Sequence, residues 1–416
     1  MTMKTLPAKF TTFLKRRADF PSLKRTRNRL LLAYLDGPAG TQVPRQVIDA
    51  IVHYYTTCNA NTHGCFITTR ESDQLLEDTR EVIATFLGAK SSRTISLGAN
   101  MTTLTYSLSR GIARWLKPRD EILITQLDHE ANRGPWLALR EHGIVVREVV
   151  LKQEGTLDYD DMRAKTTSRT RLIALGGASN ALGTVNNIAL AREIASSVGA
   201  WLLVDAVHYA PHFPIDVGAL DADFLVCSAY KFYGPHVGIL YAREGLLDEL
   251  EPDRLRTQDQ IAPYKIETGT LNHAAIAGVK AAIEYIASFG SGADLRSQIV
   301  SAMQLIAEYE HRLAIALYDG LGTIPEVTIY GPDFESSHRA PTISFTLASK
   351  TAEEVCTQLG DRGICAWDGH FYAIRPIEVL GLLERGGVTR IGISLYNTEE
   401  EISRLLRELK QIAKGK

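Results

Sequence analysis

The chain lacks a long apolar run. No stretch approaches the ~20 consecutive apolar residues that a membrane span needs, and no secretory signal core stands near the N-terminus. The net charge is only −2, which leaves no overall field to hold nucleic acid or an anionic membrane. The cysteines number five, an odd count, so we expect free thiols in a reducing, cytoplasmic compartment rather than a disulfide framework.

Acidic residues are scarce at the N-terminus. Residues 1–30 contain nine Lys and Arg side chains against the single acid Asp19. Such a segment is typical of a transit peptide, which is basic and acid-poor. It is equally typical of an N-terminal helix with a solvated basic face. Apolar side chains such as Phe13 and Phe20 favour the second interpretation, a helical segment that packs on a C-terminal domain.

The chain is too long for one small core. Its 416 residues predict a large domain and a smaller one. Strands alternate with helices up to about residue 285, which predicts an α/β domain over 31–285. A long helical run from about 295 to 318 follows, and Thr342–Leu347 alternates in period two. These features predict a small α+β domain over 286–416 with a half-exposed antiparallel sheet.

The central stretch 201–241 contains three short apolar runs that predict buried strands. Asp205 follows the first run and Lys231 lies just beyond the second, where open α/β sheets bind ligands. One interpretation is a buried ion pair, which is costly to desolvate. The other is a pyridoxal phosphate site, in which a lysine forms a Schiff base and an acid keeps the pyridine nitrogen protonated.

A second candidate feature is the turn Gly98–Thr103, which opens a helix. Free backbone N–H groups and the helix dipole make such a turn a phosphate site. An ordinary capped helix is the simpler interpretation of the spacing. Beside a cofactor, Asn100, Met101 and Thr102 become candidate phosphate ligands.

Two motifs carry a resemblance to a known family. Val204–His208 reads VDAVH and Ser228–Pro235 reads SAYKFYGP. They resemble the signature of class V aminotransferases and cysteine desulfurases, fold-type I pyridoxal phosphate enzymes, and the similarity runs from about Leu35 to about Glu408. The resemblance implies an α/β large domain with a mostly parallel seven-stranded sheet, a small α+β C-terminal domain, and a homodimer with active sites at the interface.

The resemblance also implies residue roles. Asp205 becomes the pyridinium partner, Lys231 the Schiff-base lysine and His129 the catalytic imidazole stacked on the cofactor ring. The implied cofactor-binding residues are Asn100, Met101, Thr102, Asn180, Asp205, His208, Ser228, Tyr230 and Lys231, with Thr270 serving the partner's site. The implied substrate-binding residues are Arg390, which grips a carboxylate, together with His63, Trp367 and Tyr372. No metal site is expected.

The chain departs from the desulfurase pattern at the nucleophile. The branch it resembles carries a cysteine soon after a Gly-His pair, and aligning Gly369-His370 puts Tyr372 there. Trp367 stands where those enzymes have an arginine. Cys365 lies seven residues before Tyr372 on an apolar strand, so we expect a buried thiol with a raised pKa rather than a nucleophile.

The expected activity is removal of the Cα proton of a small amino acid. A lyase that eliminates a β substituent, sulfur or another group, is favoured. An aminotransferase or an epimerase of the same family is the alternative. A non-catalytic pyridoxal phosphate-binding protein is the alternative from another functional class.

Overall fold

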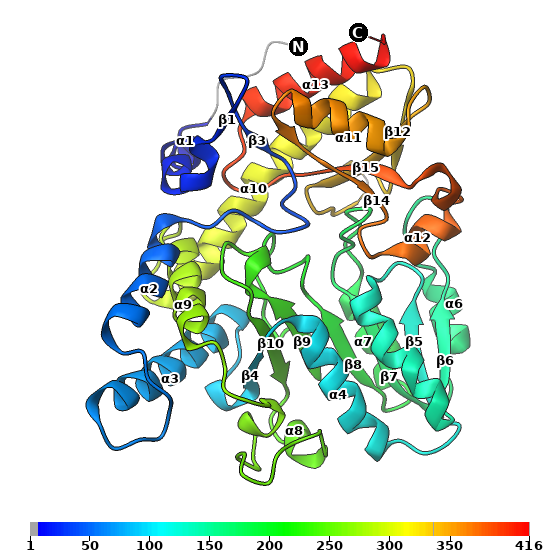
Figure 1. Ribbon diagram of the computed structural model, residues 1–416. Helices are drawn as coiled ribbons and strands as arrows, with labels where there is room; N and C mark the ends of the chain where they lie inside the picture. Colours follow the sequence, from blue (N-terminus) through cyan, green and yellow to red (C-terminus); the bar gives the residue numbers. More distant parts are fainter. Residues whose placement is uncertain (1–6, 336, 416) are drawn as a thin grey trace.

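The computed structural model describes residues 7–335 and 337–415 (Figure 1). Residues 1–6 of the predicted N-terminal segment lie outside this part. In the described part, every helix is too short or too polar to span a membrane. All five cysteines are described and are free thiols, as the sequence predicted.

The large unit is built on a sheet of seven strands in the order β4-β10-β9-β8-β7-β5-β6. Only β10 runs antiparallel to its neighbours, so the predicted mostly parallel sheet is confirmed. The strands are β4 (Ile95–Gly98), β5 (Glu121–Thr125), β6 (Val145–Val149), β7 (Thr170–Gly176), β8 (Trp201–Asp205), β9 (Phe224–Ser228) and β10 (Gly238–Ala242).

Side-chain alternation divides the core of the large unit into two layers. Leu203 of β8 faces a layer that contains Leu108 of α4, whereas Leu202 and Val204 face the opposite layer. Because both faces are covered, the strands read as continuous apolar runs. The helices of the first layer are α4 (Met101–Trp115), α5 (Gly134–Leu137) and α8 (Leu246–Glu249). Those of the second are α3 (Ile67–Leu87), α6 (Tyr159–Lys165), α7 (Ile188–Ser196), α9 (His273–Ala287) and α10 (Leu295–Gly322).

The smaller unit follows α10 and lies across the top of the large unit in Figure 1. Its sheet is antiparallel throughout, in the order β11-β12-β15-β14. These strands are β11 (Val327–Tyr330), β12 (Thr342–Leu347), β14 (Trp367–Gly369) and β15 (Val388–Gly392). Its helices are α11 (Ala352–Asp361), α12 (Ile374–Val379) and α13 (Glu399–Ala413), and the short strand β13 (Ile364–Cys365) pairs with β3 (Ala33–Tyr34).

The prediction that Thr342–Leu347 is a half-exposed strand is wrong. All residues of β12 are buried except Thr346, which is partly exposed. One side of the strand packs in the core with α10 and α11, and the other meets the large unit, where Ser344 donates to the carbonyl of Ala181. Alternating polar residues on this strand therefore mark the contact between units and not a solvated face.

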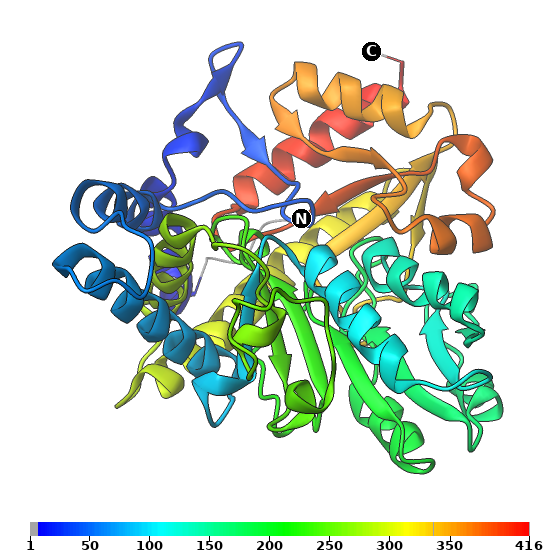
Figure 2. The same cartoon turned by 60° about the horizontal axis from the view of Figure 1, so that its bottom comes forward.

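The N-terminal segment is anchored by aromatic rings. Phe13 of α1 (Thr11–Arg16) stacks on Tyr309 of α10 at 4.4 Å, and Phe20 meets Tyr396 at 4.9 Å. Arg17 forms an ion pair of 2.7 Å with Glu401 of α13. Beyond it come the hairpin β1 (Thr26–Arg27) and β2 (Leu30–Leu31) and the helix α2 (Arg45–Thr57), which lies beside α9 in both views (Figures 1 and 2).

Candidate active site

A cavity of about 630 Å³ lies at the carboxyl ends of β8 and β9. It is found where the crossover connections of an open α/β sheet leave room for a ligand. Its lining includes most of the predicted cofactor residues: Asn100, Met101, Thr102, His129, Asn180, Asp205, His208, Ser228, Tyr230 and Lys231. The structure therefore brings together side chains that are up to 131 positions apart in the sequence, from Asn100 to Lys231.

Lys231 is buried in the 3-10 turn that follows β9 (Ala229–Lys231). Its Nζ donates to the carbonyl oxygen of Ala39 at 3.1 Å and also to that of Pro38. Burial lowers the pKa of Lys231 to about 7, and the charge of Arg390 adds to the effect. The amine is thus largely uncharged just above neutral pH, the form in which a lysine acts as a nucleophile or a base.

Asp205 ends β8 and lies near a second buried carboxyl, that of Asp128. Asp205 Oδ1 accepts the N–H of Val207 at 2.9 Å, and burial raises the pKa of Asp205 to about 6. Asp128 also lines the cavity, and its Oδ1 accepts the N–H of Gly176 at 2.6 Å while its Oδ2 has no partner. Burial, with the charge of Asp205, raises the pKa of Asp128 to about 7. Sequence reasoning missed Asp128, which stands directly before His129.

His129 caps the short 3-10 turn Glu130–Asn132. Its Nδ1 accepts the N–H of Ala131 at 3.0 Å, which leaves the proton of the neutral ring on Nε2. Burial lowers the pKa of His129 to about 4. The imidazole is therefore neutral at physiological pH and suited to lie on an aromatic face.

The start of α4, where phosphate binding is predicted, lines one part of the cavity. Asn100 caps the helix by accepting the N–H of Thr103 at 2.9 Å, and the N–H of Met101 donates to Ser228 Oγ at 2.9 Å. The positive end of a 15-residue helix, one feature of an anion site, is thus present, while the N–H groups of Met101 and Thr103 already have side-chain acceptors. Tyr230 stacks on His236, a cavity residue that the sequence had not singled out, with ring centroids 4.6 Å apart.

The imidazole of His208 and the amide of Asn180 both contact the smaller unit. His208 Nε2 contacts Thr342 Oγ1 at 2.9 Å, whereas its buried Nδ1 has no partner. Asn180 lines the cavity, and one N–H of its Nδ2 donates to the carbonyl of Phe371 at 3.0 Å, so its expected amide contact with a cofactor or substrate stays a prediction.

Arg390 is not a free guanidinium fork. It is 1% exposed on β15, its Nη2 pairs with Asp36 Oδ1 at 2.8 Å, and its Nη1 donates to the carbonyl of Asn180 at 3.1 Å. A substrate carboxylate at this arginine would share it with Asp36, so the predicted role stays a prediction. Asp36 comes from the Gly/Pro loop near the N-terminus, and nothing in its local sequence identifies it as the partner.

The other predicted substrate residues lie outside the cavity lining. Trp367 pairs with Arg390 across β14 and β15 and is 45% exposed, and Tyr372 is 66% exposed with its ring 6.0 Å from that of His129. His63 and Thr270 line a separate cavity of about 750 Å³. A single chain therefore does not bring them to the first cavity, and their expected service to a partner's site stays a prediction.

The donor set fits pyridoxal phosphate. The helix start with Ser228 suits the phosphate, Lys231 suits the aldehyde carbon, and Asp205 suits the pyridine nitrogen. The unpartnered Nδ1 of His208 is a buried polar atom that the phenolic oxygen would satisfy. Among the described residues, no group of three or more His, Cys, Asp or Glu side chains could hold a metal ion.

Comparisons with known proteins agree with this site. The family model for aminotransferase class V matches residues 33–405. A cysteine desulfurase of Enterobacter sp. (strain 638) is 35% identical over 419 residues, covering 96% of this chain and 97% of the relative. One of Escherichia coli (strain SE11) is 34% identical with the same coverage.

Two solved structures of cysteine desulfurases have the same fold as this chain. The apo cysteine desulfurase of Thermococcus onnurineus NA1 superposes with a TM-score of 0.87 at 27% identity and full coverage of both chains. The cysteine desulfurase CsdA of Escherichia coli gives 0.84 at 28% identity, with 97% and 98% covered. The chain therefore belongs to the aminotransferase class V family, as a pyridoxal phosphate-dependent enzyme of the cysteine desulfurase-like kind.

Proposed function

We propose that this enzyme removes the Cα proton of a sulfur-bearing amino acid and expels the β-sulfur directly into solution. For L-cysteine, the Cα–H and Cβ–S bonds break, sulfide leaves, and water completes the conversion of the remaining carbon skeleton to pyruvate and ammonium. No sulfur is stored on the protein.

The observation that carries this proposal is the composition of the cavity wall. Among the described residues, no cysteine lines the cavity. Cys365, the candidate nearest in sequence to the expected nucleophile position, lies on β13 beside Tyr34 of β3, and burial raises its pKa. A thiol that resists ionisation is a poor acceptor of sulfur, because the thiolate is the reactive form. Cys365 is partly exposed rather than fully buried, which corrects the sequence-based expectation.

The residues of the cavity divide the remaining work. Bound pyridoxal phosphate supplies an electron sink for the pair left at Cα. Lys231, uncharged near neutral pH, takes up the Cα proton and carries a proton for the next step. Asp205 holds the proton of the pyridine nitrogen in place, and the neutral ring of His129 covers the face of the site.

Product analysis of the holoenzyme with L-cysteine tests the proposal. We expect pyruvate, ammonium and sulfide in equal amounts and no alanine. Alanine as the product would mean that sulfur passes to an acceptor, as in a desulfurase. Keto acid without ammonium would indicate an aminotransferase, and solvent deuterium at Cα without net product an epimerase. No change in any substrate tested would leave a non-catalytic binding protein.

We also propose a cytoplasmic homodimer whose active sites lie at the interface. Exposed apolar side chains support it: Val52 and Tyr55 on α2 and Phe66 and Ile67 at the start of α3 are 54–72% exposed. A surface of this kind is typical of a subunit contact. Light scattering of the holoenzyme should give twice the chain mass of 45.9 kDa, and a monomer would contradict the proposal.

A further inference from the structure

The loop between β14 and α12 is backbone-strained. Phe371 and Tyr372 both have positive φ angles, 55° and 58°, in the left-handed region that bulky side chains rarely adopt. Such residues are strained and persist only where the surroundings hold them. The contacts of this loop with the large unit show what holds it.

Two hydrogen bonds to backbone carbonyls fix the strained pair. The carbonyl of Phe371 accepts from Asn180 Nδ2 at 3.0 Å, and the carbonyl of Tyr372 accepts from the N–H of Glu130 at 2.8 Å. Glu130 directly follows His129. The second bond therefore sets the ring of Tyr372 against that of His129, with centroids 6.0 Å apart.

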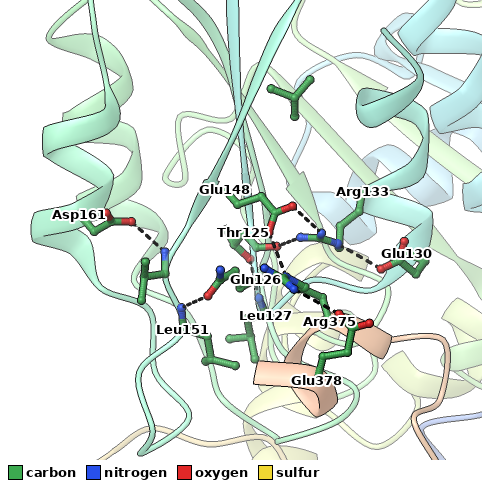
Figure 3. A network of polar contacts seen from close by, with 12 residues as sticks. Thr125, Gln126, Leu127, Glu130, Arg133, Glu148, Leu151, Asp161, Arg375 and Glu378 are labelled. Atoms are coloured by element: carbon green, nitrogen blue, oxygen red, sulfur yellow. Dashed lines mark hydrogen bonds and ion pairs between the residues drawn. The ribbon is translucent and has the colours of Figure 1, made fainter. Parts of the chain in front are cut away.

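An ion-pair bridge holds the helix that leaves this loop (Figure 3). Glu148 on β6 accepts from Arg133 at 3.1 Å through one oxygen and from Arg375 of α12 at 3.1 Å through the other. Arg133 also donates to Glu130 at 3.1 Å and to the carbonyl of Thr125. Glu148 thus connects the smaller unit to the turn that contains His129 and Glu130.

Glu148 is the centre of the bridge because it accepts from both arginines. The side chain of Arg133 is 4% exposed, that of Glu148 22% and that of Arg375 37%. Burial alone would raise the pKa of Glu148, but the charges of Arg133 and Arg375 outweigh it and lower that pKa. The carboxylate stays ionised at neutral pH. Arg375 has one further partner, Glu378, 3.2 Å away on its own helix.

We propose that Glu148 is a positioning residue: by bridging Arg133 and Arg375 it holds the Phe371–Tyr372 loop against His129, a residue that lines the cavity. Glu148 does not line the cavity and touches no reacting group. Loss of the bridge should therefore loosen the contact between this loop and His129, weaken substrate binding and leave the chemical step almost intact.

Arg375→Gln is the variant that tests this inference, because it opens the bridge and still leaves Arg133 paired with Glu148 and Glu130. The matched control is Glu378→Gln, which removes a partner of the same arginine within α12 but keeps the link to the large unit. Glu148→Gln is a second test from the other side, and Arg375→Lys tests rescue by a conservative change.

Amide hydrogen exchange of the holoenzyme gives a reading that needs no turnover. The N–H of Glu130 should exchange at least about tenfold faster in Arg375→Gln than in Glu378→Gln, because its acceptor Tyr372 is released. Equal exchange in the two variants would overturn the proposal. The reading stands even where the proposed lyase activity, on which only the kinetic test rests, fails.

The kinetic test uses L-cysteine and the products named above. Arg375→Gln should raise KM about fivefold, the effect of one partly buried ion pair, with kcat within about twofold of wild type. Arg375→Lys should restore most of the wild-type KM. An unchanged KM in Arg375→Gln, or an equal rise in KM in Glu378→Gln, would mean that the bridge contributes only to general stability. Either result would contradict a positioning role.

Discussion

The chemistry of Lys231 is set by what surrounds its amine. The side chain is buried, and two carbonyl oxygens accept hydrogen bonds from its amine. The positive charge of Arg390 lowers the pKa of Lys231 by more than the negative charge of Asp205 raises it. Burial favours the uncharged form of an amine. The result is a base and nucleophile that is ready at neutral pH, which an exposed lysine is not.

This shift predicts how apoprotein takes up pyridoxal phosphate. The free amine of Lys231 has a pKa of about 7 instead of its ordinary 10.5, so its reactive fraction rises as pH increases through 7. The rate of incorporation, followed by absorbance, should increase between about pH 6 and about pH 8 and then level off. A rate that keeps rising towards pH 10 would contradict the lowered pKa. Borohydride reduction and peptide mapping should place the cofactor on Lys231 alone.

The site residues that lie in a local sequence motif could be predicted. Those that a distant segment of the chain supplies could not. Asp205, Lys231, Ser228 and His129 lie in or beside recognisable strand ends, and the structure gathers them. Asp36 was missed because it pairs with Arg390 across 354 positions of sequence. Such pairs depend on how two units meet, which no local pattern encodes.

At the scale of elements, the phosphate end depends on the close approach of β10 to the turn before α4. A Cβ on Gly238 would lie 2.3 Å from the carbonyl carbon of Asn100, a backbone atom that cannot move alone. The absence of a side chain at Gly238 therefore lets the turn before α4 pack directly against the first residue of β10.

Gly238→Ala should consequently weaken both the fold and the cofactor site. We expect a loss of about 1–3 kcal/mol in the free energy of unfolding from overpacking, and faster loss of pyridoxal phosphate on dialysis. Gly360→Ala is the control, since a Cβ at Gly360 of α11 meets nothing within 4 Å. That change should be neutral or stabilise the helix by about 0.5–1 kcal/mol. Tight cofactor retention by Gly238→Ala would contradict the close-approach argument.

Element types were predictable because the hydrophobic periods are clear, and boundaries were less so. The helix α3, for example, begins at Ile67, and its N-cap residue Phe66 makes no side-chain cap bond that could signal the start. The β12 strand was assigned correctly but its burial was not, since polar residues such as Thr342 and Ser344 bond to the large unit instead of to water.

At the scale of the whole molecule, the two units meet beside the cavity. The residues that line the cavity come from the large unit, and the smaller unit approaches them through the loop with Tyr372, whose ring lies 6.0 Å from that of His129. That loop is the segment where the resembling desulfurases carry their nucleophile. Here it presents a tyrosine, and its backbone is tied to Glu130 and Asn180. The domain boundaries at 31 and 286 stay predictions.

In the proposed reaction, sulfur leaves without binding to the protein, and mass spectrometry of the intact holoenzyme after reaction with L-cysteine tests this directly. We predict no adduct on any cysteine, and the same result for Cys365→Ala with little loss of activity. Tyr372→Cys, which places a thiol on the loop beside His129, is the positive control. A mass gain of about 32 Da on wild-type Cys365, one persulfide sulfur that reduction removes, would contradict the claim and identify a desulfurase.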